Sequence, residues 1–219
     1  MEKCVRFSKG EALRFGWQAM KENFWFFVGA GIVAVIVVMI PSMLSELLAK
    51  KLSVFSIILT IVGMVLQIGI GLGAIKIALK LCDWEDVGIG DLFSCFHLVF
   101  KSLISNILAG LIVFIGFCLL IVPGIIWGIK LQFAGYLIVD KGIGPINALE
   151  SSWKMTKGVK WNLCVFGILL VLINILGVLC LFLGLFVTVP MTMVAMAFVY
   201  RRLLTNAEDT QVLSEPISL

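Results

Sequence analysis

Charged side chains are scarce in this sequence. Only 14% of its 219 residues are Asp, Glu, Lys or Arg, whereas a soluble domain carries about 25%. Hydrophobic residues make up 61% and the mean hydropathy is +1.14, which is more apolar sequence than a soluble core could hold. The composition therefore excludes an ordinary soluble domain and predicts an all-α polytopic membrane protein.

Residues that bind metals or serve as nucleophiles are equally few. His97 is the single histidine, and the six cysteines show neither C-x-x-C nor Cys/His ligand spacing. No Ser or Cys motif suggests a nucleophile, and Gly88-Ile89-Gly90 lacks the third glycine of a phosphate-binding loop. We therefore predict that the protein is not an enzyme, and we expect no disulfide, metal, cofactor or nucleic-acid partner.

Long uncharged runs are what the chain has instead. The run 102–139 would be about 57 Å long as one helix, nearly twice the thickness of a bilayer core, so Pro123–Gly124 is predicted to break it into a hairpin. Gly184 and Pro190 divide the last long run in the same way, and Pro41 is predicted to end the first span because proline cannot donate to the helix ladder. The six predicted spans are about 23–42, 53–79, 102–120, 123–139, 161–183 and 187–204.

Three shorter amphipathic segments lie beside these spans, at about 8–22, 90–101 and 145–160. In the first, Leu13, Trp17, Met20 and Phe24 share one helical face, which predicts a helix lying in the headgroup plane with that face in the lipid. The second is too short to span and is predicted to be interfacial or re-entrant.

Residues 1–204 are predicted to form a single membrane domain, followed by a mobile cytoplasmic tail at 205–219. Gly69 and Gly73, spaced as G-x-x-x-G in the second span, predict the close approach of a neighbouring helix. With both termini in the cytoplasm, only Lys50 and Lys51 of the 17 basic residues lie outside. The positive-inside rule therefore predicts that orientation, in the cell (inner or plasma) membrane.

Two spacings recur along the chain. The pattern L-x3-W-x3-K-x3-W begins at Leu13 and again at Leu149, and K-x9-D-x-G-I-G begins at Lys76 and again at Lys130. We predict three copies of an interfacial helix followed by two spans. Because each copy has an even number of crossings, this is a parallel internal repeat about an axis near the membrane normal.

The stretch 123–158 carries a recognisable pattern. It contains P-G-I-I-x-x-x-K-x-x-F-x-x-Y-x-I-x-D and then A-L-x-x-S-W-x-x-x-K-G. This pattern resembles a group of prokaryotic six-span membrane proteins of unknown function, related to the membrane domain of membrane-bound glycerophosphodiester phosphodiesterases. The resemblance implies a six-span membrane fold with the loop 140–160 in the cytoplasm. It implies no activity, because the carboxylates and histidines of a phosphodiesterase site are absent.

Lys130 is the most unusual polar residue in the spans. A lysine at that depth costs a few kcal/mol, and such residues usually face a bundle interior or a wet cavity. In a functional role, Lys130 would bind an anionic headgroup or form part of a gate. In a structural role, its side chain would snorkel toward the cytoplasm and pair with a carboxylate or a helix C-terminus. Lys76, its counterpart in the repeat, is expected to snorkel.

Other polar residues are predicted to have structural roles. Asp86 and Asp140 each precede x-G-I-G, which predicts a turn with a carboxylate near the start of the next helix. A proton or cation site is the alternative. Gln132 is a candidate for a hydrogen bond between helices, and Tyr136 is a further candidate polar residue in the membrane.

Tryptophans and lysines favour contact with the lipid bilayer. Indole rings prefer the headgroup zone, and the predicted anchors are Trp17, Trp25, Trp153 and Trp161. Lys154, Lys157 and Lys160 could attract anionic headgroups at about 1 kcal/mol each. The alternative is that they are ordinary positive-inside charges.

Two functional hypotheses follow. The first is a non-enzymatic scaffold, accessory or regulatory protein that acts through lipid contact. The second is a small transporter or lipid-translocating protein with a cavity at Lys130. A polar funnel reaching that lysine would favour the second hypothesis, and a closed centre would favour the first.

Overall fold

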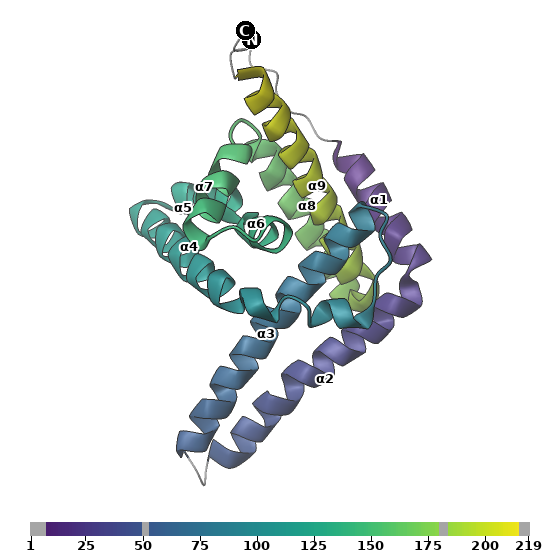
Figure 1. Cartoon of the computed structure of the whole chain (residues 1–219), viewed down its shortest axis with the longest axis vertical. Coiled ribbons are helices and arrows are strands. Elements are labelled where there is room, and N and C mark those ends of the chain that lie inside the picture. Colours follow the sequence, from purple (N-terminus) through teal and green to yellow (C-terminus); the bar gives the residue numbers. More distant parts are fainter. Residues whose placement is uncertain (1–7, 50–52, 180–183, 215–219) are drawn as a thin grey trace.

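A computed structural model describes residues 8–49, 53–179 and 184–214, and the regular structure in these ranges is entirely helical (Figure 1). The elements in chain order are α1 (Lys9–Glu22), α2 (Phe24–Ala49), α3 (Ser53–Cys82), the 3-10 helices η1 (Ile89–Leu92) and η2 (Phe96–Leu98), α4 (Val99–Leu119), α5 (Ile121–Leu131), α6 (Ala134–Lys141), α7 (Pro145–Met155), α8 (Lys160–Leu179) and α9 (Leu185–Ser214).

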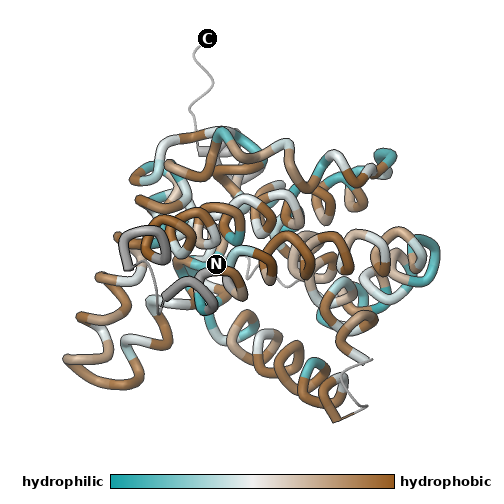
Figure 2. Tube along the Cα trace, turned by 90° about the horizontal axis from the view of Figure 1, so that it is seen from below, coloured by the Kyte–Doolittle hydropathy of each residue, from teal (hydrophilic) through white to brown (hydrophobic). Residues whose placement is uncertain are grey.

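Six helical stretches in the described ranges are long and apolar enough to cross a membrane. They are Phe24–Pro41, Ile57–Cys82, Ile89–Leu119, Ile121–Lys141, Lys160–Leu179 and Leu185–Ala207. Hydrophobic residues run along nearly every helix (Figure 2). The prediction of an all-helical chain with six helices long and apolar enough to cross a membrane is thereby confirmed for the described residues.

The breaks between spans differ from the predicted ones. The hairpin between α4 and α5 turns at Leu120, whose extended backbone has φ −167° and ψ 150°, so Pro123 lies in the first turn of α5, where no amide donor is needed. Gly116 and Gly124 let the two helices touch, because a Cβ on Gly116 would lie 2.9 Å from the Gly124 Cα.

Two other prolines do not end their helices. Pro41 lies inside α2, which continues to Ala49, so it does not end the helix, although the apolar span Phe24–Pro41 ends at this residue. Pro190 lies inside α9. Transmembrane helices tolerate interior prolines because neighbouring groups satisfy the freed carbonyls. Gly184, which was predicted to divide the last run, directly precedes α9. Residues 180–183, at the end of the predicted fifth span, lie outside the described ranges.

The predicted span 123–139 is not one helix. It consists of α5 and α6, which are separated by a turn at Gln132–Phe133. The second helix ends at Gly142, which has φ 63° and therefore the left-handed conformation that glycine adopts without strain. This broken span positions the candidate site described below.

The three segments predicted to be interfacial take different forms. The segments 8–22 and 145–160 contain the regular helices α1 and α7, whereas 90–101 contains η1, η2 and only the first turn of α4. Helix α9 extends to Ser214, so most of the predicted tail is helical, and 215–219 lie outside the described residues.

Helix α1 has a buried face that the sequence analysis did not identify. It runs beside α9 (Figure 1) and buries Ala12, Gly16, Ala19 and Met20. Of the predicted apolar face only Met20 belongs to this set, and Trp17 is 42% exposed. The face buried toward α9 therefore consists mainly of small residues, together with Met20, and Phe15 packs on Phe198 of α9 with ring centroids 5.0 Å apart.

Close packing on α3 involves its two predicted glycines. A Cβ on Gly73 would lie 2.1 Å from the Leu92 carbonyl oxygen of η1, and a Cβ on Gly69 would lie 2.6 Å from the Phe96 ring. The predicted close approach is confirmed, but the neighbour is a pair of 3-10 helices.

The α2–α3 hairpin extends away from the other helices (Figure 1). The core lies among those other helices, and its largest fully buried side chains include Phe133, Phe166 and Tyr200.

Candidate functional site

The candidate site surrounds the break between α5 and α6. A helix that stops within a span leaves carbonyl groups that need a donor, because lipid supplies none. The Ser152 hydroxyl of α7 donates to the Lys130 carbonyl oxygen at 2.6 Å. The Thr156 hydroxyl donates to the Ser152 carbonyl at 2.8 Å and lies 3.5 Å from the same Lys130 oxygen. Both hydroxyl residues are fully buried, so α7 satisfies the backbone at the break.

The Lys130 side chain lies against α7. Its Nζ is 3.7 Å from the centroid of the Trp153 ring, which is a cation–π contact. The Trp127 ring also packs against the Trp153 ring, with ring centroids 6.4 Å apart. Lys157 and Lys160 are close enough to repel the Lys130 charge. Among the described residues, none of these three lysines forms an ion pair.

Neither hypothesis for Lys130 described this arrangement. Its partner is an aromatic ring rather than a carboxylate. The neighbouring cavity is lined by Gly128, Leu131 and Gln132 and not by Lys130. We call Lys130, Trp153, Lys157 and Lys160 the basic cluster. Lys154 differs, because it pairs with Glu150 at 2.7 Å, and this hydrogen bond holds the pKa of the exposed Glu150 carboxyl below its usual value.

Lys76, the repeat counterpart of Lys130, has polar partners instead. Its Nζ donates to the Ser94 hydroxyl at 2.9 Å and lies 4.0 Å from the Asp91 carboxylate. Lys80 lies 3.1 Å from the same carboxylate. Asp91 also accepts the Gly88 backbone N–H at 3.0 Å. A carboxylate therefore caps η1, as expected for this turn, but Asp91 supplies it.

Asp86 and Asp140 do not have the predicted helix-start role. Asp86 is exposed, and the contact that it makes within the described ranges is through its backbone carbonyl oxygen, which accepts from Lys80 Nζ at 3.4 Å. Asp140 lies in the last turn of α6 and accepts the Tyr200 hydroxyl at 2.8 Å. It also pairs with Arg201 at 2.8 Å. Tyr200 and Arg201 of α9 therefore hold the Asp140 carboxylate away from the start of α7.

The Asp140 contacts belong to a network between three helices. Arg201 also pairs with Asp83, which directly follows α3. The Tyr136 ring lies 5.4 Å from the Tyr200 ring, so two of the predicted polar residues, Tyr136 and Asp140, meet at α9. The network ties α3, α6 and α9 together at one end.

A cavity of about 580 Å³ lies on the other side of the broken span. Residues of α3, α4, α5 and α6 line it, together with Met193 of α9. The lining contains no charged residue, and its polar members are Ser102, Ser105, Asn106 and Gln132. Gln132, at the break, also lines a groove of about 320 Å³ between α5 and α8.

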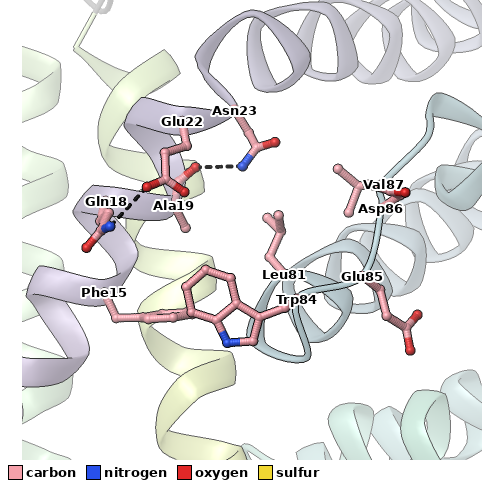
Figure 3. A pocket seen from close by; sticks show the side chains of 10 residues that line it. All are labelled: Phe15, Gln18, Ala19, Glu22, Asn23, Leu81, Trp84, Glu85, Asp86 and Val87. Atoms are coloured by element: carbon pink, nitrogen blue, oxygen red, sulfur yellow. Dashed lines mark hydrogen bonds between the residues drawn. The ribbon is translucent and has the colours of Figure 1, made fainter.

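A third pocket of about 230 Å³ lies between α1 and the loop after α3 (Figure 3). Trp84 and Phe15 form its wall in an edge-to-face contact, with ring centroids 5.9 Å apart. Glu22, at the rim, accepts the Gln18 amide at 2.9 Å. The carboxylates around this pocket are exposed, and they make no buried site.

The predicted tryptophan anchors lie at the surface. Trp25 is 83% exposed and Trp161 is 67% exposed, whereas Trp17 and Trp153 are covered in part by their lysine contacts. Trp84, which the sequence analysis did not select, is also exposed. In the described ranges no three His, Cys, Asp or Glu side chains could hold a metal ion together.

Several residues of the site were missed from the sequence. A serine and a threonine four residues apart on α7, Ser152 and Thr156, were a usable signal for capping of a neighbouring backbone. Arg201 was counted only as an inside charge, and nothing distinguished Tyr200 or Ser105 from other polar residues in apolar runs.

Comparison with known proteins gives one weak match. Over 132 residues the chain is 30% identical to the uncharacterized protein Rv2560 of Mycobacterium tuberculosis (strain ATCC 25618 / H37Rv). The match covers 60% of this chain and 40% of that protein, so the chain spans well under two thirds of its relative's length. No family model and no solved structure matches the chain.

Proposed function

We propose that this multi-pass membrane protein is a non-enzymatic scaffold, accessory or regulatory protein that acts through contact with anionic lipid. The observation that carries the proposal is the basic cluster. Three lysines with no carboxylate partner among the described residues lie close enough to repel one another's charge, and one of them, Lys130, stacks on Trp153. The phosphate of an anionic headgroup would supply the countercharge that these lysines lack. Indole rings also prefer the headgroup region of the bilayer.

The expected strength follows from the charges. Each lysine near a membrane surface contributes about 1 kcal/mol of attraction to anionic lipid, so three contribute about 3 kcal/mol, or roughly 100-fold in affinity. The transporter hypothesis depended on a cavity at Lys130. Because Lys130 stacks on Trp153 and does not line the 580 Å³ cavity, the geometry favours lipid contact at this position.

Lipid-dependent thermal unfolding tests the proposal. The purified protein in neutral detergent is titrated with dioleoylphosphatidylglycerol or with dioleoylphosphatidylcholine, and the shift of the unfolding midpoint is compared. Bound lipid stabilises the folded state, so the anionic lipid should give the larger shift. Replacing Lys130, Lys157 and Lys160 together by Gln should remove the difference between the two lipids.

Lys154→Gln is the matched control, since Lys154 lies in the same segment but is paired with Glu150. This variant should keep the preference for phosphatidylglycerol. If the triple variant keeps the preference as well, the basic cluster is not the lipid site. Comparing two lipids on one variant separates this effect from any loss of stability caused by removing the Lys130–Trp153 contact.

We further propose that the protein lies in the plasma membrane with both termini in the cytoplasm, as the distribution of basic residues favours. The described C-terminal helix allows a direct test. Alkaline phosphatase fused after Ala207 should be inactive and a fluorescent protein fused there should be fluorescent. The opposite pair of results would reverse the orientation.

The three-fold repeat and the resemblance to the six-span group belong to the same proposal. Lys76 and Lys130 each contact the segment that follows a Gly-Ile-Gly turn, Lys76 at Ser94 and Lys130 at Trp153, which supports a common origin of the two units. We propose that α1, the η1–η2 segment and α7 are the interfacial or re-entrant members of the three units.

A further inference from the structure

The cavity at the broken span has a mouth and a buried end. Gly71 of α3 and Gly110 of α4 are exposed, and a Cβ added to either would meet no atom within 4 Å. The buried end is formed by residues such as Leu72 and Ser105, which are 3% and 1% exposed. The cavity is therefore open toward the surrounding lipid between α3 and α4, and it deepens toward the α5–α6 break.

Ser105 is a hydroxyl group without a hydrogen bond. Its Oγ is buried, lines the cavity, and has no hydrogen-bond partner among the described residues. A serine in a helix usually donates to a carbonyl one turn earlier, and a buried polar group left unpaired is costly. Two amide side chains, Asn106 and Gln132, line the same cavity.

The chemistry of this lining selects one class of ligand. Its apolar wall favours a hydrocarbon chain, its hydroxyl and amide groups require a polar atom, and no charged side chain compensates a phosphate. A volume of about 580 Å³ lies within the roughly 300–1,000 Å³ of small-molecule sites. We infer that the cavity binds an uncharged lipid, such as a diacylglycerol, whose hydroxyl or carbonyl group hydrogen-bonds to Ser105.

This site is separate from the basic cluster. Lys130 faces α7, whereas Gln132 faces the cavity on another side of α5. The two sites also differ in charge, so they should prefer different lipids. Binding of diacylglycerol should therefore be unchanged when Lys130, Lys157 and Lys160 are replaced by Gln, and either site can fail without the other.

The test measures binding of a fluorescent dioleoylglycerol to the full-length protein in detergent, with unlabelled dioleoylglycerol and dioleoylphosphatidylglycerol as competitors. Gly110→Leu and Gly71→Leu should each lower affinity at least tenfold, because the new side chain fills the mouth. Gly29→Leu on α2, where an added Cβ also meets nothing within 4 Å, is the matched control and should bind like the wild type.

Ser105→Ala tests the hydrogen bond itself. Loss of one hydrogen bond should weaken diacylglycerol binding about fivefold. The unfolding midpoint without ligand should be no lower than that of the wild type, since the hydroxyl has no partner to lose. Weaker binding in a variant of equal stability distinguishes a ligand contact from a structural role.

Three results would overturn the inference. Equal binding by the wild type and Ser105→Ala would mean that the cavity accepts only an acyl chain. Equal competition by phosphatidylglycerol would mean that the headgroup is not recognised. A change of oligomeric state in Gly110→Leu, with diacylglycerol binding absent from the wild type, would assign the groove to a second copy of the chain.

Discussion

The contact between α3 and η1 gives the sharpest test of the packing. A Cβ on Gly73 would lie 2.1 Å from the Leu92 carbonyl oxygen and 2.5 Å from the Leu92 Cα. Both are backbone atoms, so no side-chain rotation can relieve the clash. In Gly73→Ala, η1 must move by roughly 1 Å, a form of overpacking that costs about 1–3 kcal/mol or more.

Gly71→Ala supplies the reference on the same helix. Both substitutions gain the same helix propensity, about 1 kcal/mol, because each replaces glycine by alanine within α3. An added Cβ at Gly71 meets nothing within 4 Å, so this variant should be as stable as the wild type or slightly more so. The difference between the two alanine variants therefore isolates the clash, which we place at about 3 kcal/mol.

Thermal unfolding in detergent, followed by circular dichroism, measures this difference. For a chain of this size, about 3 kcal/mol corresponds to a midpoint roughly 6–12 °C lower in Gly73→Ala than in Gly71→Ala. The same displacement of η1 should loosen Asp91, which holds Lys76 and Lys80. Equal midpoints for the two variants would refute the close packing of η1 on α3.

Three further predictions concern polar contacts, and all are measured as free energies of unfolding in detergent. Tyr200→Phe should cost about 1.5–3 kcal/mol, because it removes a hydrogen bond to the Asp140 carboxylate and keeps the ring; an additive double-mutant cycle with Asp140→Asn would contradict this contact. Ser152→Ala should cost about 1–3 kcal/mol, since the Lys130 carbonyl loses its closest donor, and a neutral result would mean that the break needs no cap. Asp91→Asn should destabilise the protein more in low salt than in high salt; no dependence on salt would argue against its ion pairs.

The spans were predictable from the sequence because the cause is local. A run of about 20 predominantly apolar residues without a charge is long enough to cross the bilayer as a helix, and this property does not depend on the rest of the sequence. The ends of the helices were harder to predict. Proline ends a helix in water, but Pro41 and Pro190 lie within helices, and Pro123 begins one. Proline does remove a backbone donor at each of these positions. Within a membrane protein, neighbouring groups can satisfy the freed carbonyl, so the helix continues.

The site was predictable only in part. Lys130 could be singled out from the sequence, because a lysine within an apolar run is costly in any membrane fold. Its partner Trp153 lies on α7, and the partners of Asp140 lie on α9, 60 residues away at Tyr200. Such pairs depend on how helices distant in sequence meet, and spacing within one helix carries no information about them. The unpaired hydroxyl of Ser105 is likewise a property of packing.

The pairing of α1 with α9 has a consequence for biogenesis. Gly16 is pressed so closely against α9 that a Cβ there would lie 2.5 Å from the Met191 carbonyl oxygen. Of the described helices, the first to leave the ribosome is thus covered by the last. While the translocon inserts the intervening helices, the Ala12–Ala19 face has no native partner, and a chaperone or a protease can detect it. Completion of α9 then closes the fold, so a chain truncated before Met191 should be degraded even though most of its spans are intact.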